Sequence, residues 1–187
     1  FWSSREGVLL HQVEIDRAHL PPIEESGLTA SLVNIVPDLD APVLYLLLYY
    51  YASSADKAST SVTARAHPLD LRTRQYGTAI ELPQNPGRKE KVGFTTQEIV
   101  RPPYDLLGAG SNGHLYLLGY TDSNLYNLVV LSVEGKVRGK AWVVIEDSEL
   151  TYRDTHLSPS GIIYGLLCGQ TKADVSWWRS DRLLKAD

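Results

Sequence analysis

The chain has 187 residues, 43% of them apolar and 21% charged, which fits one globular domain with a buried core. Its formal net charge of −4 at pH 7 argues against a nucleic-acid partner, because such proteins usually carry a basic patch that neutralises phosphates. No apolar run approaches the roughly 18–20 residues of a membrane span, so we expect no such span.

The chain begins with Phe1-Trp2, an apolar pair typical of the middle of a structural element, and it contains no methionine. These features predict a processed product or a fragment of a longer protein, so targeting signals cannot be judged from this sequence. The compartment therefore stays open, with a secreted or periplasmic location favoured.

Short apolar segments separated by Gly, Pro, Asp and Ser turns follow one another along the chain. They predict β-strands, and no window keeps a period of 3.6 residues with helix caps at both ends. We therefore expect an all-β fold in a single domain covering residues 1–187. The predicted strands are residues 8–15, 29–36, 43–51, 61–71, 76–82, 104–107, 114–120, 125–133, 140–145, 151–157, 162–168 and 175–179. Residues 83–101, with their Pro, Gly and charged residues, are predicted to be an insertion or a long loop.

Residues 43–51, with the sequence VLYLLLYYY, contain no charge and no helix cap. A continuous apolar run of this length, rich in tyrosine, is typical of a strand that is covered on both faces. A buried helical segment is the alternative.

The pattern of residues 43–51 recurs twice. In each place a candidate strand, a polar turn and an apolar strand with a tyrosine follow one another, and a further apolar strand comes next. The three stretches are LVNIV-PDLDAP-VLYLLLYYY, YDLL-GAGSNG-HLYLLGYT and TH-LSPSG-IIYGLLCG, in which Tyr45, Tyr116 and Tyr164 fall in register. We call these three residues the repeat tyrosines.

Antiparallel units at this spacing resemble the blades of a β-propeller, of the loosely patterned kind with an S-P-x-G-x-x-Y turn. The signatures of WD40 and kelch repeats are missing. The resemblance implies about three and a half blades, below the ~4–8 of closed propellers, so the chain would be the C-terminal part of a larger ring or a second polypeptide would supply the other blades. It also implies inner strands that are apolar on both faces, as in residues 43–51 and their two echoes. A β-sandwich or a barrel is the alternative fold.

Catalytic motifs are absent: the sequence has no G-x-S-x-G, H-E-x-x-H, Walker or dinucleotide signature. We predict no cofactor and no metal site, since the five histidines share no ligand spacing. Asp38 and Asp40 suit turn capping better than Ca²⁺ binding. The single cysteine, Cys168, lies in an apolar run, which predicts a buried and unreactive thiol.

Polar residues on the strands that would line a propeller channel are the candidates for ligand binding. They are Asn34, Asp105, Asp154 and His156, with Tyr104, Tyr152 and Arg153 beside them for stacking and bidentate contacts. The competing interpretation is that they hydrogen-bond to the backbone or to channel water.

Trp177, Trp178 and Arg179 form the most unusual string in the chain. Because neighbouring residues of a strand point to opposite faces, one tryptophan could anchor a partner protein while the other packs in the core. Packing of both tryptophans between blades is the alternative.

The sequence therefore predicts a non-enzymatic binding or scaffold module that presents a propeller face to a protein or a small ligand. The alternatives are a propeller-fold hydrolase or lyase acting on carbohydrate or peptide, and a lectin-like module. All three rest on analogy with the fold.

Overall fold

The computed structural model describes residues 15, 20–21, 27–53, 60–85, 88–92, 95–99, 103–110, 113–122, 125–144, 151–158 and 161–179. These residues form strands and turns without a helix, so the predicted all-β fold is confirmed. None of the described segments is a helix that could span a membrane. The strands are β1 (Leu28–Pro37), β2 (Val43–Ser53), β3 (Thr60–Asp70), β4 (Gln75–Tyr76), β5 (Ile80–Glu81), β6 (Arg88–Val92), β7 (Thr95–Ile99), β8 (Asp105–Ala109), β9 (Leu115–Asp122), β10 (Leu125–Leu131), β11 (Val137–Val144), β12 (Thr151–Leu157), β13 (Ile162–Cys168) and β14 (Ala173–Arg179).

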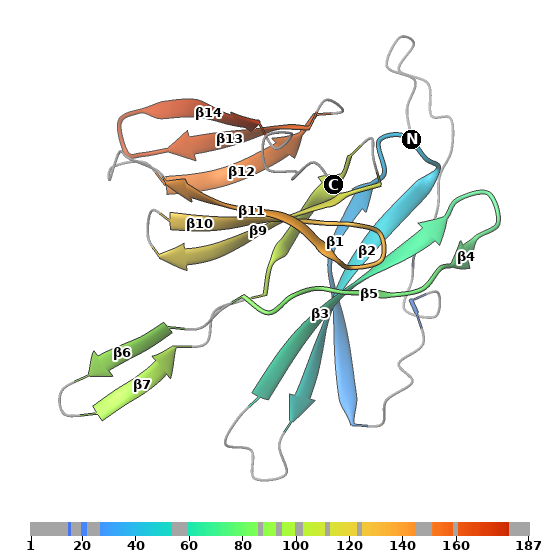
Figure 1. The fold of residues 1–187 in the computed structure, drawn as a ribbon, viewed down its shortest axis with the longest axis horizontal. Helices are drawn as coiled ribbons and strands as arrows, with labels where there is room; N and C mark the ends of the chain where they lie inside the picture. Colours follow the sequence, from blue (N-terminus) through green and yellow to red (C-terminus); the bar gives the residue numbers. More distant parts are fainter. Residues whose placement is uncertain are drawn as a thin grey trace.

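The strands form three antiparallel sheets and a separate hairpin (Figure 1). The first sheet has the order β1-β2-β3-β4, with β5 also paired to β3; the second has the order β8-β9-β10-β11; the third has the order β12-β13-β14. Apart from β5, which pairs with β3, consecutive strands within a sheet are neighbours, as short turns between antiparallel strands require. The β6–β7 hairpin lies within the residues predicted to be an insertion and projects away from the three sheets (Figure 1).

The three sheets stack face to face in chain order, with a hydrophobic core in each gap. The first core joins Val36, Tyr45, Leu47, Ala66 and Ile80 of the first sheet to Leu106, Leu115, Leu117, Val129 and Leu131 of the second. The second core joins Tyr116, Leu118, Leu128, Val130 and Val143 of the second sheet to Leu157, Ile163 and Leu167 of the third. A third core covers the other face of the first sheet, where Leu46, Leu48, Tyr50 and Leu69 pack with Ile15 and Leu20.

The apolar run of β2 is explained by this stack. Successive side chains of a strand point to opposite faces. Tyr45 and Leu47 enter the first core, whereas Leu46 and Leu48 enter the third. The same holds for β9, which shares its residues between the first and second cores. The prediction of strands covered on both faces is therefore confirmed for β2 and β9.

The prediction is wrong for β13. Ile163 and Leu167 are buried in the second core, but Tyr164 and Leu166 on the opposite face are 38% and 41% exposed. The reason is that the third sheet is the last of the described sheets, and no described residue packs on its outer face. The apolar sequence of β13 resembles that of β2 and β9, so it could not show that one face of β13 is exposed.

Three hairpin turns share one backbone shape. Gly113, Gly135 and Gly161 have positive φ angles of 66°, 78° and 76°, a conformation that glycine adopts without steric cost. The N–H of each glycine donates to the carbonyl three residues earlier, at 2.9–3.0 Å. These turns fix the register of β8 with β9, β10 with β11 and β12 with β13.

The β1–β2 turn is held by Asp38. Its Oδ1 accepts hydrogen bonds of 2.9 Å from the backbone N–H groups of Asp40 and Ala41, which confirms turn capping by this residue. Cys168, at the end of β13, is partly buried rather than fully buried.

Candidate functional site

The first strands of the three sheets, β1, β8 and β12, lie next to one another, with β8 in contact with both of the others. At the β1 side, Leu39 N–H donates to Ala109 O at 3.3 Å. At the β12 side, a Cβ added to Gly108 would lie 3.1 Å from Leu157 Cδ2. Side chains that project from these strands therefore gather in one region of the molecule.

Each first strand has a polar residue at the same position of its ladder. In each sheet this polar residue pairs with the residue of the second strand that follows the repeat tyrosine by two positions. The pairs are Asn34 with Leu47, Asp105 with Leu118, and Asp154 with Leu166. We call Asn34, Asp105 and Asp154 the polar rung. The structure thus gives equivalent positions to three of the residues that the sequence singled out.

A break in register accompanies the polar rung in each first strand. The shifts fall between Leu32 and Asn34 in β1, between Leu106 and Gly108 in β8, and between Tyr152 and Asp154 in β12. An extra residue of this kind bends the strand and re-aims its side chains, and such bulges are frequent near functional sites.

Asn34 uses its amide to join two sheets. Its Nδ2 donates to Leu106 O in β8 at 3.1 Å, and its Oδ1 accepts from the N–H of Ile35 at 2.8 Å. Both ends of the amide are therefore hydrogen-bonded to backbone. This agrees with the alternative interpretation of these polar residues, in which they bind backbone groups rather than a ligand. Asn34 acts here as a clamp between the first and second sheets.

Asp105 begins β8 and interacts with Tyr49 of β2. Tyr49 Oη donates to Asp105 Oδ1 over a long 3.4 Å. Partial desolvation raises the pKa of the Asp105 carboxyl, while the hydrogen bond from Tyr49 acts in the opposite direction. Desolvation, and then the nearby Asp105 charge, raise the pKa of Tyr49. Asp105 therefore presents a hydrogen-bond acceptor beside a phenol.

Asp154 and His156 lie on β12 and both side chains are exposed. Asp154 Oδ1 accepts a hydrogen bond of 2.8 Å from the N–H of Thr155. No hydrogen bond links His156 to a carboxylate within the part of the chain that the structure describes. The pair can contact a ligand, but it does not form a prepared acid–base couple.

Tyr104 does not fit the stacking role predicted for it. The side chain is only 2% exposed, and its hydroxyl accepts a hydrogen bond of 2.5 Å from Asn127 Nδ2. A Cβ added to Gly119 would lie 2.5 Å from the ring, so the absence of a side chain at Gly119 makes room for it. The ring therefore belongs to the core between the first and second sheets.

The remaining predicted residues have described backbones only. Tyr152 and Arg153 belong to β12, and Trp177, Trp178 and Arg179 belong to β14. Their side chains lie outside the described part of the structure, so the ligand and partner roles assigned to them stay predictions.

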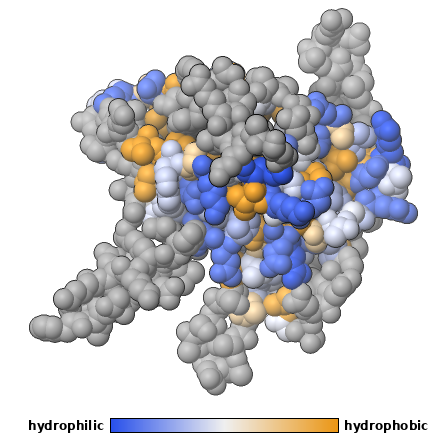
Figure 2. Space-filling view, in the orientation of Figure 1, coloured by the Kyte–Doolittle hydropathy of each residue, from blue (hydrophilic) through white to orange (hydrophobic). Residues whose placement is uncertain are grey.

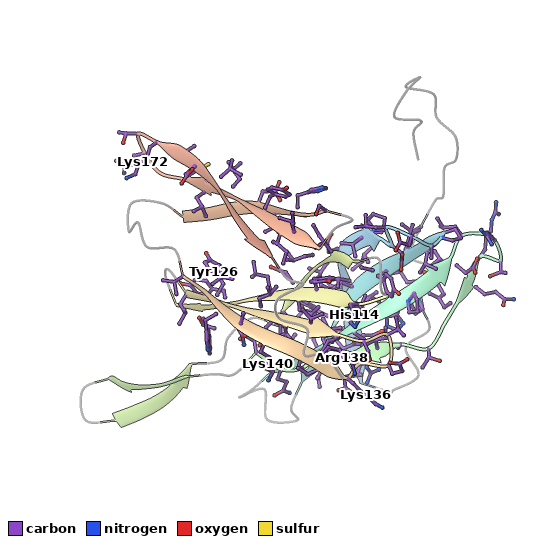
Figure 3. All side chains as sticks on the ribbon, turned by 45° about the horizontal axis from the view of Figure 1, so that its top comes forward. His114, Tyr126, Lys136, Arg138, Lys140 and Lys172 are labelled. Carbon is purple, nitrogen blue, oxygen red and sulfur yellow. The ribbon has the colours of Figure 1, made fainter. Side chains whose placement is uncertain are left out.

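Sequence reasoning overlooked Tyr49, which reaches Asp105 across the gap between two sheets. A partner on a neighbouring sheet leaves no local signal in the sequence. It also overlooked a basic stretch in which Lys136 directly precedes β11 and Arg138 and Lys140 lie on that strand (Figure 3). The two-residue spacing of these three basic residues could have revealed the stretch.

A cleft of about 590 Å³ lies elsewhere, between β5 and the β10–β11 turn. It is lined by Thr78, Ala79, Ile80, Glu81, Val133, Glu134 and Gly135, and contains no residue of the polar rung. Its two carboxylates come from exposed residues, and nothing in its lining pairs a nucleophile with a base.

No group of three or more His, Cys, Asp or Glu side chains among the described residues could hold a metal ion. Comparison of the chain with protein-family models, with curated proteins and with solved structures finds no match. What the site can do is therefore argued from its geometry.

Proposed function

We propose that the chain is a section of a β-propeller and acts as a non-enzymatic binding module, whose ligand contacts the polar rung. The observation that carries this proposal is the equivalence of Asn34, Asp105 and Asp154 on three neighbouring first strands. Stacked antiparallel sheets in chain order, each a simple meander, also suit consecutive blades.

The arrangement of the first strands supports the position of the site. In a propeller, the blades surround a central channel, and the innermost strand of each blade lines it. β1, β8 and β12 are the first strands of their sheets, and β8 contacts both of the others. Equivalent side chains on such strands would form an arc around the channel.

The chemistry of the rung indicates the class of ligand. Two of its three members are carboxylates, and Asn34 is already engaged with backbone. Carboxylates accept hydrogen bonds and attract positive charge. We therefore favour a ligand with several donors, such as a sugar or a basic peptide segment.

A thermal-shift comparison tests this function. The chain would be heated with neutral oligosaccharides, with an Arg/Lys-rich peptide and with an acidic peptide as a negative probe. We expect one of the donor-rich probes to raise Tm, and Asp105→Asn to reduce that rise at least by half, because the amide loses the charge and one acceptor.

Asp174→Asn is the matched control. Asp174 is an exposed carboxylate whose Oδ1 accepts a 2.8 Å hydrogen bond from the next residue, as Asp154 does, but it lies on β14. The control should leave the shift unchanged. No shift with any donor-rich probe, or a shift equal in both variants, would contradict the proposal.

Catalysis on carbohydrate or peptide is the second candidate, favoured by the raised pKa of Asp105 beside a phenol. A carboxyl of this kind can serve as a general acid. Turnover of a donor-rich probe that Asp105→Asn abolishes without loss of binding would establish this function. Binding without turnover would leave the module non-enzymatic.

A further inference from the structure

β11 is an outermost strand of the second sheet, and among the described residues it pairs with β10 alone. Its outer edge therefore offers backbone N–H and C=O groups to a further strand. The edge is eight residues long, whereas the first sheet carries only the two-residue strands β4 and β5 beyond β3. An edge of this length is a template on which an extended peptide can pair.

The side chains of β11 divide between a covered and an open face. Val143 is 5% exposed and packs in the second core, toward the third sheet. Val137 and Lys140 lie on the opposite face, because they pair with Leu131 and Val129 of β10, which belong to the first core. Both are nevertheless exposed, since the first sheet covers β10 on this face and does not extend over β11.

The open face continues with Trp142 and Val144, which are 60% and 58% exposed. They follow Lys140 at two-residue spacing and therefore share its face. We call Val137, Lys140, Trp142 and Val144 the β11 row. Figure 2 shows small hydrophobic patches bordered by hydrophilic residues in the middle of the view, where β11 crosses in Figure 1. Exposed tryptophan is typical of interface anchors, whereas an edge that is only protected from pairing carries charges in its place.

The charge along the strand is positive. Lys136 precedes β11, Arg138 is the extra residue where the register with β10 shifts, and Lys140 belongs to the row. Glu134 lies near enough to Lys136 and Arg138 to offset part of their charge. Within the described part of the chain, no carboxylate forms an ion pair with Lys140. An acidic strand would bring the complementary charge, whereas the β11 of a second copy would bring like charge.

We propose that β11 binds an extended acidic peptide of a partner protein, which adds as a fifth strand to the four-stranded second sheet. Main-chain hydrogen bonds supply the affinity, and an acidic side chain beside Lys140 and an apolar one on Trp142 supply the specificity. This site is independent of the polar rung, because β8 and β11 are opposite edges of the second sheet. The inference goes beyond the proposed function and does not depend on a propeller.

Fluorescence anisotropy of a dye-labelled peptide with alternating Glu and Val residues tests the proposal. The peptide should bind, and a peptide with alternating Lys and Val residues should not. Lys140→Glu should weaken binding at least about fivefold, because attraction becomes repulsion. Trp142→Ala should weaken it at least about tenfold, because the anchor is lost. Circular dichroism of each variant checks that the sheets are retained.

Two further variants serve as controls. Lys172→Glu makes the same change of charge at an exposed lysine in the β13–β14 turn of the third sheet (Figure 3). It should leave the affinity unchanged, and so should Asp105→Asn. An acidic peptide should therefore shift Tm equally in wild type and Asp105→Asn, which separates this site from the polar rung. No binding by wild type, or equal weakening by Lys172→Glu and Lys140→Glu, would overturn the proposal.

N-methylated peptides test whether the ligand adds as a strand. Successive N–H groups of a strand point to opposite edges, so the acidic peptide can be methylated on either alternate set. One form should lose binding and the other should keep it, because only one set of N–H groups faces β11. Equal affinity of the two forms would overturn the proposal. Equally tight binding of a single-stranded DNA of the same charge would also overturn it, since charge alone would then decide.

Discussion

The second and third sheets have the same beginning and different surroundings. Each starts with a bulged first strand, a glycine turn and a second strand with a repeat tyrosine. Leu118 of the second sheet is 7% exposed and Leu166, its counterpart, is 41% exposed. The comparison teaches that the local pattern of turn and strand residues specifies the strands and their register, whereas burial of the second face depends on whether another described sheet packs on it.

The largest expected effect comes from truncating this matched pair of leucines. Leu118→Ala should lower the free energy of unfolding by about 2–4 kcal/mol, because it leaves a cavity in a packed core. Leu166→Ala should change it by about 0.5 kcal/mol or less in dilute monomer. Urea unfolding measures both. Equal losses of unfolding free energy in the two variants would mean that the outer face of the third sheet is covered in solution. The two sheets would then not differ in burial.

Added methyl groups should distinguish the two gaps of the stack. A Cβ at Gly119 would lie 2.5 Å from the ring of Tyr104, between the first and second sheets. At Gly108 it would lie 3.1 Å from Leu157 Cδ2, a flexible chain end between the second and third sheets. Gly119→Ala should therefore cost about 1–3 kcal/mol and Gly108→Ala less than about 1 kcal/mol. The reverse order in thermal unfolding would show that the second gap is the more rigid one.

The covered face of the first sheet should make stability depend on pH. His67 is 7% exposed, and its Nε2 lies 2.7 Å from Tyr50 Oη. Burial, and then the charge of Arg65, lower the His67 pKa to about 4. Between about pH 4 and 6.5 the unfolded chain binds the proton and the folded chain does not. Stability should therefore fall as the pH drops through this window, by up to about 1.4 kcal/mol per unit.

His67→Gln serves as the comparison for that titration. It removes the group that titrates and should flatten the part of the curve between pH 4 and 6.5. Urea unfolding at a series of pH values provides the measurement. A wild-type slope that persists in His67→Gln would assign the effect to other groups.

The smallest effect concerns the polar rung. Tyr49→Phe removes the hydrogen bond that favours ionised Asp105, so the pKa of that carboxyl should rise further above its ordinary value. Carboxyl ¹³C chemical shifts across a pH titration of wild type and Tyr49→Phe would report it. A fall in the pKa of Asp105 would show that the hydrogen bond does not act as the geometry indicates.

The sequence was sufficient to predict most of the strands and insufficient to predict what packs on them. Turn residues and apolar strands beside the repeat tyrosines predicted the hairpins β1–β2, β8–β9 and β12–β13, because both signals are local properties of the sequence. Asn34, Asp105 and Asp154 were also chosen from sequence. Their common rung could not be derived, since it depends on bulges that shift the register by one residue.

The errors have the same origin. Tyr104 looked like a candidate for ligand stacking beside Asp105, yet the lack of a side chain at Gly119, on another strand, opens the space that buries it. Tyr164 looked equivalent to Tyr45 and Tyr116, yet no described sheet follows it. Contacts between sheets, separated by many residues in the chain, decided both outcomes. Those contacts leave no pattern within a single segment.

Stacking in chain order also has a consequence for how the molecule forms. Each sheet is a meander whose contacts are close in sequence, and each gap joins sheets that are neighbours along the chain. Such an array can assemble one unit at a time from the N-terminal side during synthesis, without waiting for distant segments. Among the three sheets, amide hydrogen exchange should accordingly be fastest in β12–β14, which pack on the stack through one core. It should be slowest in β2, β9 and β10, which are covered on both faces.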